Sequence, residues 1–204
     1  MPDQKTLLVA TRNTHKREEI ALMLKGHYVV SDLNAGEFPE VEETGTSFLE
    51  NASLKAVQIS ECTGGVVLSD DSGLEVDALG GEPGVYSSSF GGEEGNHAKN
   101  NERLMRELGK LPAASSRAAR FRCVMVLADA GKVLAHFEGV VEGRIIQEAQ
   151  GAGGFGYDPL FIPEGFEETF AELGNEVKNT MSHRGRALAK VLAYLEQGES
   201  GSNR

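Results

Sequence analysis

The amino-acid sequence predicts an α/β fold, built as a long mixed central sheet flanked by helices. A strand over Lys5–Ala10 is followed by a polar turn, a helix over about Thr14–Lys25 and a strand over Tyr28–Val30. This order is typical of a βαβ unit with a parallel strand pair. Two later runs, 121–127 and 132–141, indicate an antiparallel hairpin, so the sheet is expected to contain both strand directions.

Local signals indicate further elements along the chain. The pattern Ser-x-x-Glu has capping-box spacing and starts a second helix over about residues 47–62. The apolar run 66–68 is a third strand, and we expect Ser72-Gly73 to turn the chain into a second apolar segment over 74–79. The glycine-rich stretch 80–92 is irregular, and a stretch of that length is more often functional than idle.

The second half of the chain places two helices around another glycine-rich loop. A third helix is expected over about 97–108. The loop 151–159 precedes a short strand over 160–162. Ser182 then caps a final helix over about 183–197, whose apolar residues recur at helical intervals.

Length and composition bound the class of protein. The 204 residues are 40% hydrophobic, which suits one domain over residues 1–198 with a disordered tail over 199–204. The formal net charge of −11 argues against broad binding to nucleic acid or anionic membranes. We find no apolar signal region or membrane-spanning run, and Cys62 and Cys123 are too few for a disulfide framework. We therefore expect a cytoplasmic protein without a membrane or direct nucleic acid partner.

Asp70 and Asp71 are adjacent carboxylates that follow the apolar run 66–68. Because neighbouring strand residues point to opposite faces, one is expected to face a cleft while the other braces a neighbour. Carboxylates at a strand end suit Mg²⁺, which takes oxygen ligands and keeps several waters. Glu42 and Glu43 extend this acidic set. The alternatives are a plain Asp-Asp-Ser-Gly turn and, for the glutamates, an exposed acidic loop.

A second pattern, Thr11-x-Asn13-x-x-Lys16, lies between the first strand and the first helix. Backbone N–H groups and the helix dipole form an anion site at a helix N-terminus. Thr11 and Asn13 can add donors there, and Lys16 can add a cation. Asn13 or Thr14 is also a candidate N-cap, so a capped helix with a solvated lysine is the alternative.

Two further groups of residues suggest chemistry in the last third of the chain. In the second glycine-rich loop, Phe155 offers a face on which a base can stack, and Asp158 offers a hydrogen-bond acceptor. A glycine-rich hairpin is the alternative. Lys178, His183 and Arg184 gather at a helix start, where cations oppose the helix dipole. Such a disfavoured arrangement indicates a site, with an exposed basic turn as the alternative.

The order and combination of these patterns are more specific than any one of them. The motifs are Thr11-x-Asn13-x-x-Lys16, Glu42-Glu43-Thr44-Gly45, Phe48-x-Glu50-Asn51-Ala52, Ser69-Asp70-Asp71-Ser72-Gly73-Leu74, Ala78-Leu79-Gly80-Gly81-x-Pro83-Gly84, Gly153 to Pro159, and Ser182-His183-Arg184-Gly185. Together they resemble the inosine triphosphate pyrophosphatase family, whose members hydrolyse deaminated purine nucleoside triphosphates. The resemblance spans nearly the whole chain.

The resemblance implies a role for each matching residue. Glu42 and Asp71 would bind Mg²⁺, and Asp71 would also act as general base toward the attacking water. The loop from Thr11 to Lys16 would hold the triphosphate, while His183 and Arg184 would read the purine edge. The residues expected to bind substrate are Thr11, Arg12, Asn13, Thr14, His15, Lys16, Ser72, Phe155, Gly156, Tyr157, Asp158, Lys178, His183 and Arg184.

The resemblance also implies two lobes around a substrate cleft, and a homodimer. The implied reaction converts ITP, dITP or XTP with water to the monophosphate and pyrophosphate, by attack at the α-phosphorus. Arg12 departs from the family, many of whose members carry glycine there, and this bears on how the phosphate loop closes. A general or dUTP-like pyrophosphatase and a non-catalytic nucleotide sensor are the alternative functions.

Overall fold

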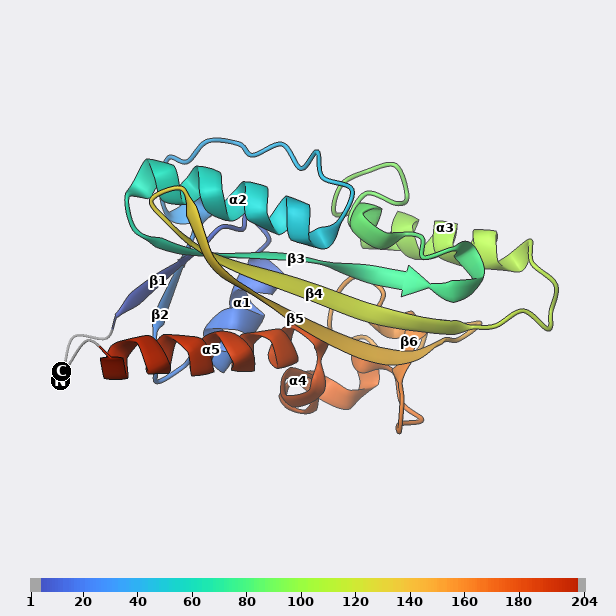
Figure 1. Ribbon diagram of the computed structural model, residues 1–204. Helices are drawn as coiled ribbons and strands as arrows, with labels where there is room; N and C mark the ends of the chain where they lie inside the picture. Colours follow the sequence, from blue (N-terminus) through green and yellow to red (C-terminus); the bar gives the residue numbers. More distant parts are fainter. Residues whose placement is uncertain (1–4, 202–204) are drawn as a thin grey trace. The chain divides into compact units, whose positions relative to one another are not determined.

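The structure is a computed structural model that describes residues 5–201, and it contains a six-stranded sheet (Figure 1). The strands are β1 (Thr6–Val9), β2 (Val29–Asp32), β3 (Val66–Val76), β4 (Ala118–Asp129), β5 (Lys132–Ile145) and β6 (Phe161–Pro163). Their order in the sheet is β2-β1-β3-β4-β5-β6. β1 is parallel to β2 and to β3, whereas β5 is antiparallel to β6. The predicted α/β class with a mixed sheet is therefore confirmed.

The helices begin at the residues that their caps indicate. They are α1 (Thr14–Met23), α2 (Phe48–Thr63), α3 (His97–Gly109), α4 (Phe170–Met181) and α5 (His183–Gly201). Asn13 caps α1 by accepting a hydrogen bond from the N–H of Lys16, and Ser47 caps α2 through the N–H of Glu50. Both caps agree with the sequence. Among the described residues, no helix is long and apolar enough to cross a membrane.

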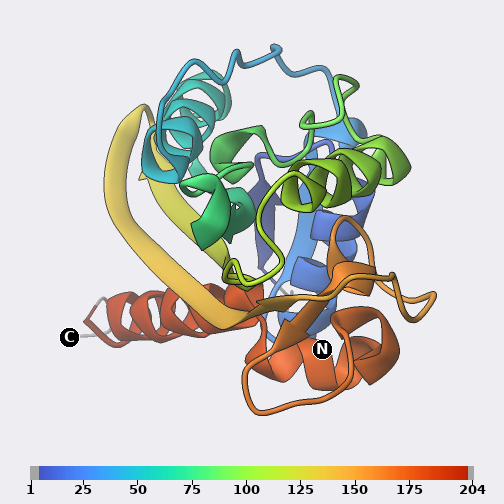
Figure 2. The same cartoon turned by 90° about the vertical axis from the view of Figure 1, so that its right-hand side faces the viewer.

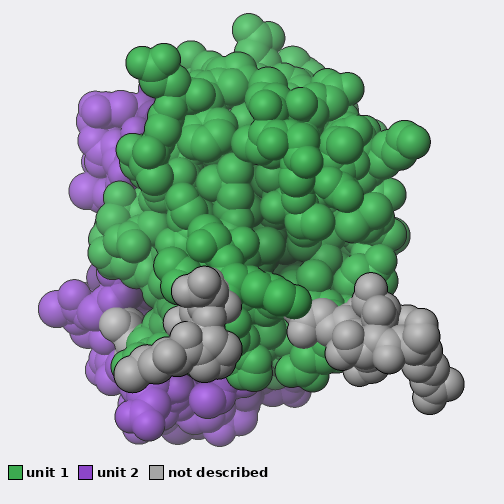
Figure 3. Space-filling model, turned by 90° about the vertical axis from the view of Figure 1, so that its left-hand side faces the viewer, with its two compact units in different colours: residues 1–71, 123–139, 184–204 green, residues 72–122, 140–183 purple. Residues whose placement is uncertain are grey.

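The chain divides into two compact units, which Figure 3 colours separately. Unit 1 comprises residues 1–71, 123–139 and 184–204, and unit 2 comprises residues 72–122 and 140–183. Strands β3, β4 and β5 each contribute residues to both units. The single domain and the substrate cleft expected from the sequence stay predictions.

Helices lie on both faces of the sheet in unit 1 (Figure 1 and Figure 2). Apolar side chains are buried between these helices and the sheet. On one face, Leu68 of β3 packs in a cluster with Ile20 of α1 and Val191 of α5. On the other face, Val67 packs in a cluster with Ile59 of α2. Since side chains alternate along a strand, this assignment fixes which face each following residue of β3 points to.

Unit 2 has an apolar cluster of its own. Leu74 and Val76 of β3 contribute to it together with Leu104 of α3. The ring of Phe121 on β4 lies edge-on to that of Phe161 on β6, with centroids 4.8 Å apart. This geometry is one that aromatic pairs prefer.

The turn predicted at Ser72-Gly73 is wrong, because β3 continues without interruption from Val66 to Val76. The four residues Asp-Asp-Ser-Gly favour turns locally, but β3 lies beside β4 in the sheet, and strand pairing favours the extended chain. Asp70 and Asp71 therefore lie in the middle of a strand and not at its end.

The sequence reading missed α4 and ended α5 too early. A capping box between Thr169 and Glu172 marks the start of α4. Gly174 interrupts that helix with a φ of 75°, which weakens its sequence pattern. The helix expected to end near residue 197 extends to Gly201, so residues 199–201 of the predicted tail are helical, and 202–204 lie outside the described residues.

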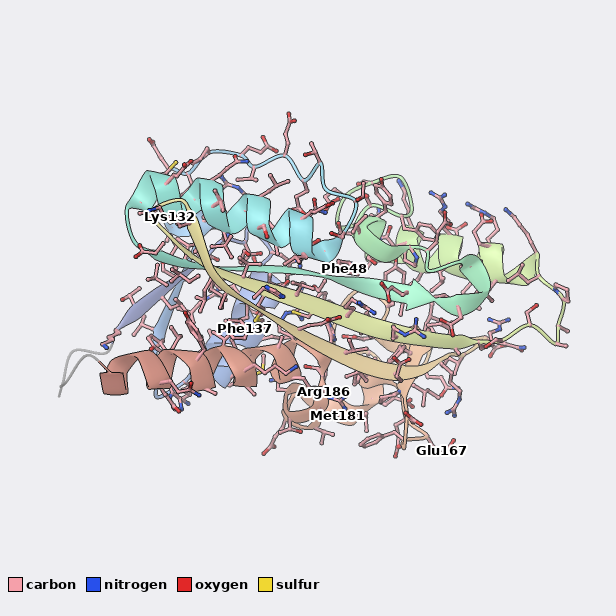
Figure 4. The ribbon with its side chains drawn as sticks, viewed as in Figure 1. Phe48, Lys132, Phe137, Glu167, Met181 and Arg186 are labelled. Carbon is pink, nitrogen blue, oxygen red and sulfur yellow. The ribbon has the colours of Figure 1, made fainter. Side chains whose placement is uncertain are left out.

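The hairpin between β4 and β5 offers a test of backbone strain. The chain turns at Ala130 and Gly131, whose φ angles are 44° and 80°, and β5 begins at Lys132 (Figure 4). We expect Gly131→Ala to lower the free energy of unfolding by about 1–2 kcal/mol, because a Cβ disfavours this conformation. Gly65→Ala is the control: a Cβ there meets nothing within 4 Å, and we expect a change within about 0.5 kcal/mol. Equal values for both variants in urea denaturation would contradict the prediction.

Candidate functional site

Asp70 is buried in β3 and is surrounded by donors from three other elements. Its Oδ1 lies 2.6 Å from Nζ of Lys16 on α1. Its Oδ2 accepts hydrogen bonds from Nε of Arg184 on α5 and from Sγ of Cys123 on β4, each at 3.0 Å. Burial opposes ionisation, but Arg184 and Lys16 outweigh it and hold the pKa of Asp70 well below its usual value. Asp70 is therefore a carboxylate whose oxygens are both engaged.

Arg184 is held by carboxylates on two elements of unit 1. Its guanidinium contacts Asp70 and, through Nη1, the carboxylate of Glu19 on α1. Only 1% of the residue is exposed, so these contacts are protected from solvent. Glu19 was missed from the sequence, although its position one turn after Lys16 on α1 places both on one face. The purine-reading role of Arg184 stays a prediction.

Asp71 points to the opposite face of β3, as the alternation of the strand predicts. Its Oδ1 lies 3.3 Å from Nζ of Lys55 on α2, which also donates to the backbone oxygen of Asp70 at 3.0 Å. The carboxylate of Glu43 lies 3.2 Å from the same ammonium. Oδ2 of Asp71 is buried and has no hydrogen-bond partner among the described residues. Burial raises the pKa of Asp71, although Lys55 and Lys16 oppose the shift.

Lys55 is a site residue that the sequence reading missed. The buried stripe of α2 contains Ala52, Ala56 and Ile59, and Lys55 lies within it. A lysine inside an apolar stripe is seldom buried without a partner. A lysine among the apolar residues of this stripe is the sequence signal that could have identified Lys55 as a site residue.

The oxygen donors of unit 1 fit a hard cation. Oδ2 of Asp71 is a buried carboxylate oxygen without a donor, and Glu43 brings a second carboxylate to Lys55. Within residues 5–201, no group of three or more His, Cys, Asp or Glu could hold a metal by itself. Mg²⁺ often binds through one or two carboxylates plus substrate phosphates and water. The residues present therefore fit Mg²⁺. Glu42, the predicted ligand, is exposed, and its pairing with Asp71 stays a prediction.

The predicted phosphate loop is shaped by its own polar side chains. Oγ1 of Thr11 accepts a hydrogen bond from the N–H of Asn13 at 3.1 Å, and Oδ1 of Asn13 caps the helix. These atoms support the turn. Thr14 and His15 are exposed at the start of α1, and Arg12 is exposed with its guanidinium directed to backbone carbonyls.

In unit 2, the side chains of Asp158 and Lys178 hold the predicted base-binding loop in place. Oδ2 of Asp158 accepts hydrogen bonds from the N–H of Phe155 at 2.8 Å and from Nζ of Lys178 at 2.6 Å. The same ammonium lies 4.8 Å from the centroid of the Phe155 ring. Tyr157 is buried, and its hydroxyl donates to the backbone oxygen of Ser87 at 2.8 Å. Burial raises the pKa of this hydroxyl. These contacts place the loop and orient Phe155.

The remaining predicted residues of unit 2 are partly or fully buried. The imidazole of His183 stacks on Phe121 with centroids 4.9 Å apart and planes 11° from parallel. The backbone oxygen of Gly156 accepts a hydrogen bond from Asn101 of α3 at 3.0 Å. Ser72 is half-buried on β3. The predicted phosphate-loop residues, Glu42, Asp71 and Arg184 belong to unit 1, and the other predicted residues belong to unit 2.

The fold and these groups define an α/β protein with the carboxylates and cations that metal-assisted phosphate chemistry uses. The chain belongs to the Ham1 family, whose model matches residues 7–194. The resemblance seen in the sequence is thereby confirmed.

Two curated proteins and one solved structure are similar to the chain over nearly their full length. A dITP/XTP pyrophosphatase of Bacillus licheniformis is 46% identical, covering 95% of this chain and 99% of its own. One of Desulforamulus reducens is 48% identical, covering 94% and 96%. Among solved structures, a HAM1 protein from Coxiella burnetii has a TM-score of 0.85 at 35% identity, covering 95% of this chain and all of its own.

The pairing of Arg184 predicts a large effect on stability without any ligand. Arg184→Ala leaves the buried Asp70 and the partly buried Glu19 without their shared cation. We expect it to lower the free energy of unfolding by about 3–5 kcal/mol. Arg186→Ala (Figure 4), an exposed arginine two residues on, is the control, and we expect a change within about 0.5 kcal/mol. If both variants unfold at the same denaturant concentration, Arg184 is not a structural cation.

Proposed function

We propose that this protein hydrolyses deaminated purine nucleoside triphosphates, namely ITP, dITP and XTP, to the monophosphate and pyrophosphate with Mg²⁺. The observation that carries the proposal is the carboxylate of Asp71, with one oxygen near Lys55 and the other buried without a hydrogen-bond partner. The names of the relatives support the substrate class. The reaction would keep deaminated nucleotides out of nucleic acid.

Asp71 is the group that activates water in this proposal. The water oxygen forms a bond to the α-phosphorus, and the bond from that phosphorus to the bridging oxygen breaks. Pyrophosphate leaves with the electron pair, and the carboxylate of Asp71 takes a proton from the water. Lys55 holds Oδ1 of Asp71 and leaves Oδ2 to act. Positioning and proton transfer of this kind contribute about 10²–10⁴-fold.

The lysines of unit 1 offset negative charge. Burial lowers the pKa of Lys16, but the pairing of Lys16 with Asp70 outweighs burial and raises that pKa. The Lys16 side chain therefore stays cationic. Its ammonium and that of Lys55 can stabilise charge that develops on phosphoryl oxygens. Mg²⁺, held by Asp71 with Glu42 or Glu43, would offset the triphosphate charge and stabilise the leaving pyrophosphate.

The base is read in unit 2 according to this proposal. Phe155, which Asp158 and Lys178 hold in place, offers a ring for stacking. Inosine and xanthine carry oxygen at C6, so a donor such as the imidazole of His183 suits that edge. We also propose, following the family resemblance, that the protein is a cytoplasmic homodimer.

The proposed role of Asp71 predicts a loss of turnover without loss of fold. Asp71→Asn keeps the shape of the side chain but removes its charge and basicity. We expect kcat for ITP to fall by roughly two orders of magnitude or more. Asp77→Asn, which alters a half-exposed carboxylate paired with Arg120, should retain full activity. Pyrophosphate release near the parent rate by Asp71→Asn at saturating Mg²⁺ would exclude this role.

The proposed substrate class predicts a preference among nucleotides. We expect kcat/KM for ITP and XTP to exceed that for ATP and GTP by at least about tenfold. ATP has an amino group in place of the C6 oxygen, and GTP carries a 2-amino donor for which the proposed pocket has no acceptor; an unpaired buried donor costs ~1–3 kcal/mol. Removing Mg²⁺ with a chelator should abolish release of pyrophosphate. Equal values for ITP and GTP, or a preference for dUTP, would favour the general pyrophosphatase. Binding of ITP without turnover would indicate a nucleotide sensor.

A further inference from the structure

Arg12 connects the phosphate loop to the segment 33–46, which joins β2 to α2. Its Nη2 donates to the backbone oxygen of Phe38 at 2.9 Å, and its Nη1 donates to that of Leu33 at 3.4 Å. In return, Nδ2 of Asn34 donates to the backbone oxygen of Arg12 at 3.2 Å. The loop and the segment are therefore hydrogen-bonded in both directions.

The segment has further restraints in its middle and at its far end. From residue 36 to 46 it has no helix or strand, and it runs beside α2 (Figure 1 and Figure 2). Phe38 and Val41 pack against an apolar cluster of unit 1. At the far end, the N–H of Gly45 donates to a side chain of α2 at 2.8 Å. The acidic pair Glu42-Glu43 lies between the contact of Phe38 with Arg12 and the contact of Gly45 with α2. Arg12 therefore holds the segment on the side of Phe38.

We propose that Arg12 is a positioning residue that fixes the segment carrying Glu42 and Glu43 before Mg²⁺ binds. The inference rests on the proposed function and concerns the metal side of the same site. A guanidinium presents a planar fork of donors and can hold two carbonyl oxygens together.

The energetic reason is the entropy of the segment. Ordering a flexible segment opposes binding, so a segment that is ordered in advance binds its ligand more tightly. Glu43 already lies 3.2 Å from Lys55, which in turn contacts Asp71. Arg12 therefore acts on the cation through the segment. A direct contact between Arg12 and substrate phosphate, as the sequence resemblance implies, would instead act on nucleotide binding.

Limited proteolysis of the protein without metal or nucleotide tests the anchor. A glutamate-specific protease has exposed sites in the segment at Glu37, Glu40, Glu42 and Glu43. We expect Arg12→Ala to be cut there about tenfold faster, because cleavage follows the population of the open segment. Arg12→Lys, which can replace one of the two contacts, should be intermediate. Arg106→Ala, which removes an exposed guanidinium of α3, should match the parent.

Kinetics separate positioning from substrate binding. In Arg12→Ala, the Mg²⁺ concentration for half-maximal hydrolysis of ITP should rise about tenfold, as loss of a charged donor predicts. KM for ITP at saturating Mg²⁺ should stay within about twofold, a change of only ~0.4 kcal/mol. Unchanged proteolysis overturns the proposal, and a raised KM with an intact segment assigns Arg12 to the phosphate. Faster proteolysis in a protein that hydrolyses no nucleotide would support the anchor and reject the proposed function.

Discussion

Asp70 and Asp71 are neighbouring carboxylates buried on opposite faces of one strand, and this placement constrains the elements around them. A buried carboxylate without cations or donors costs several kcal/mol. Each face of β3 must therefore supply its own cations. Lys16 and Arg184 do so from α1 and α5 on one face, and Lys55 does so from α2 on the other. The helices of unit 1 are thus joined to the sheet by charge as well as by apolar packing.

The two carboxylates are satisfied unequally, and this inequality separates their roles. Asp70 engages both oxygens with Lys16, Arg184 and Cys123. Asp71 engages one oxygen with Lys55 and leaves the other without a hydrogen-bond partner among the described residues. Because a buried ion pair adds little net stability, the contacts of Asp70 are better explained by placement: they fix the strand that carries Asp71. In the proposed function, Asp70 supports and Asp71 reacts.

Features set by local pattern could be predicted from the sequence, and features set by distant partners could not. The caps, the βαβ unit and the opposite orientation of Asp70 and Asp71 follow from short-range rules. The turn expected at Ser72-Gly73 fails because strand pairing overrides its local preference. Lys55 was missed because its partner Asp71 lies sixteen residues further along the chain. Motif resemblance identified the family, but it could not show which motif residues contact one another.

Those mutual contacts bear on how each cation can act in the proposed reaction. An ammonium has three donors, so Lys16 can keep its contact with Asp70 and still donate to a phosphate oxygen. Its side chain is 16% exposed, so a ligand can reach it from solvent. The side chain of Lys178 is only 2% exposed and is directed to Asp158 and the Phe155 ring. In the proposed function, Lys16 can therefore contact substrate directly, whereas Lys178 would hold the loop that presents Phe155.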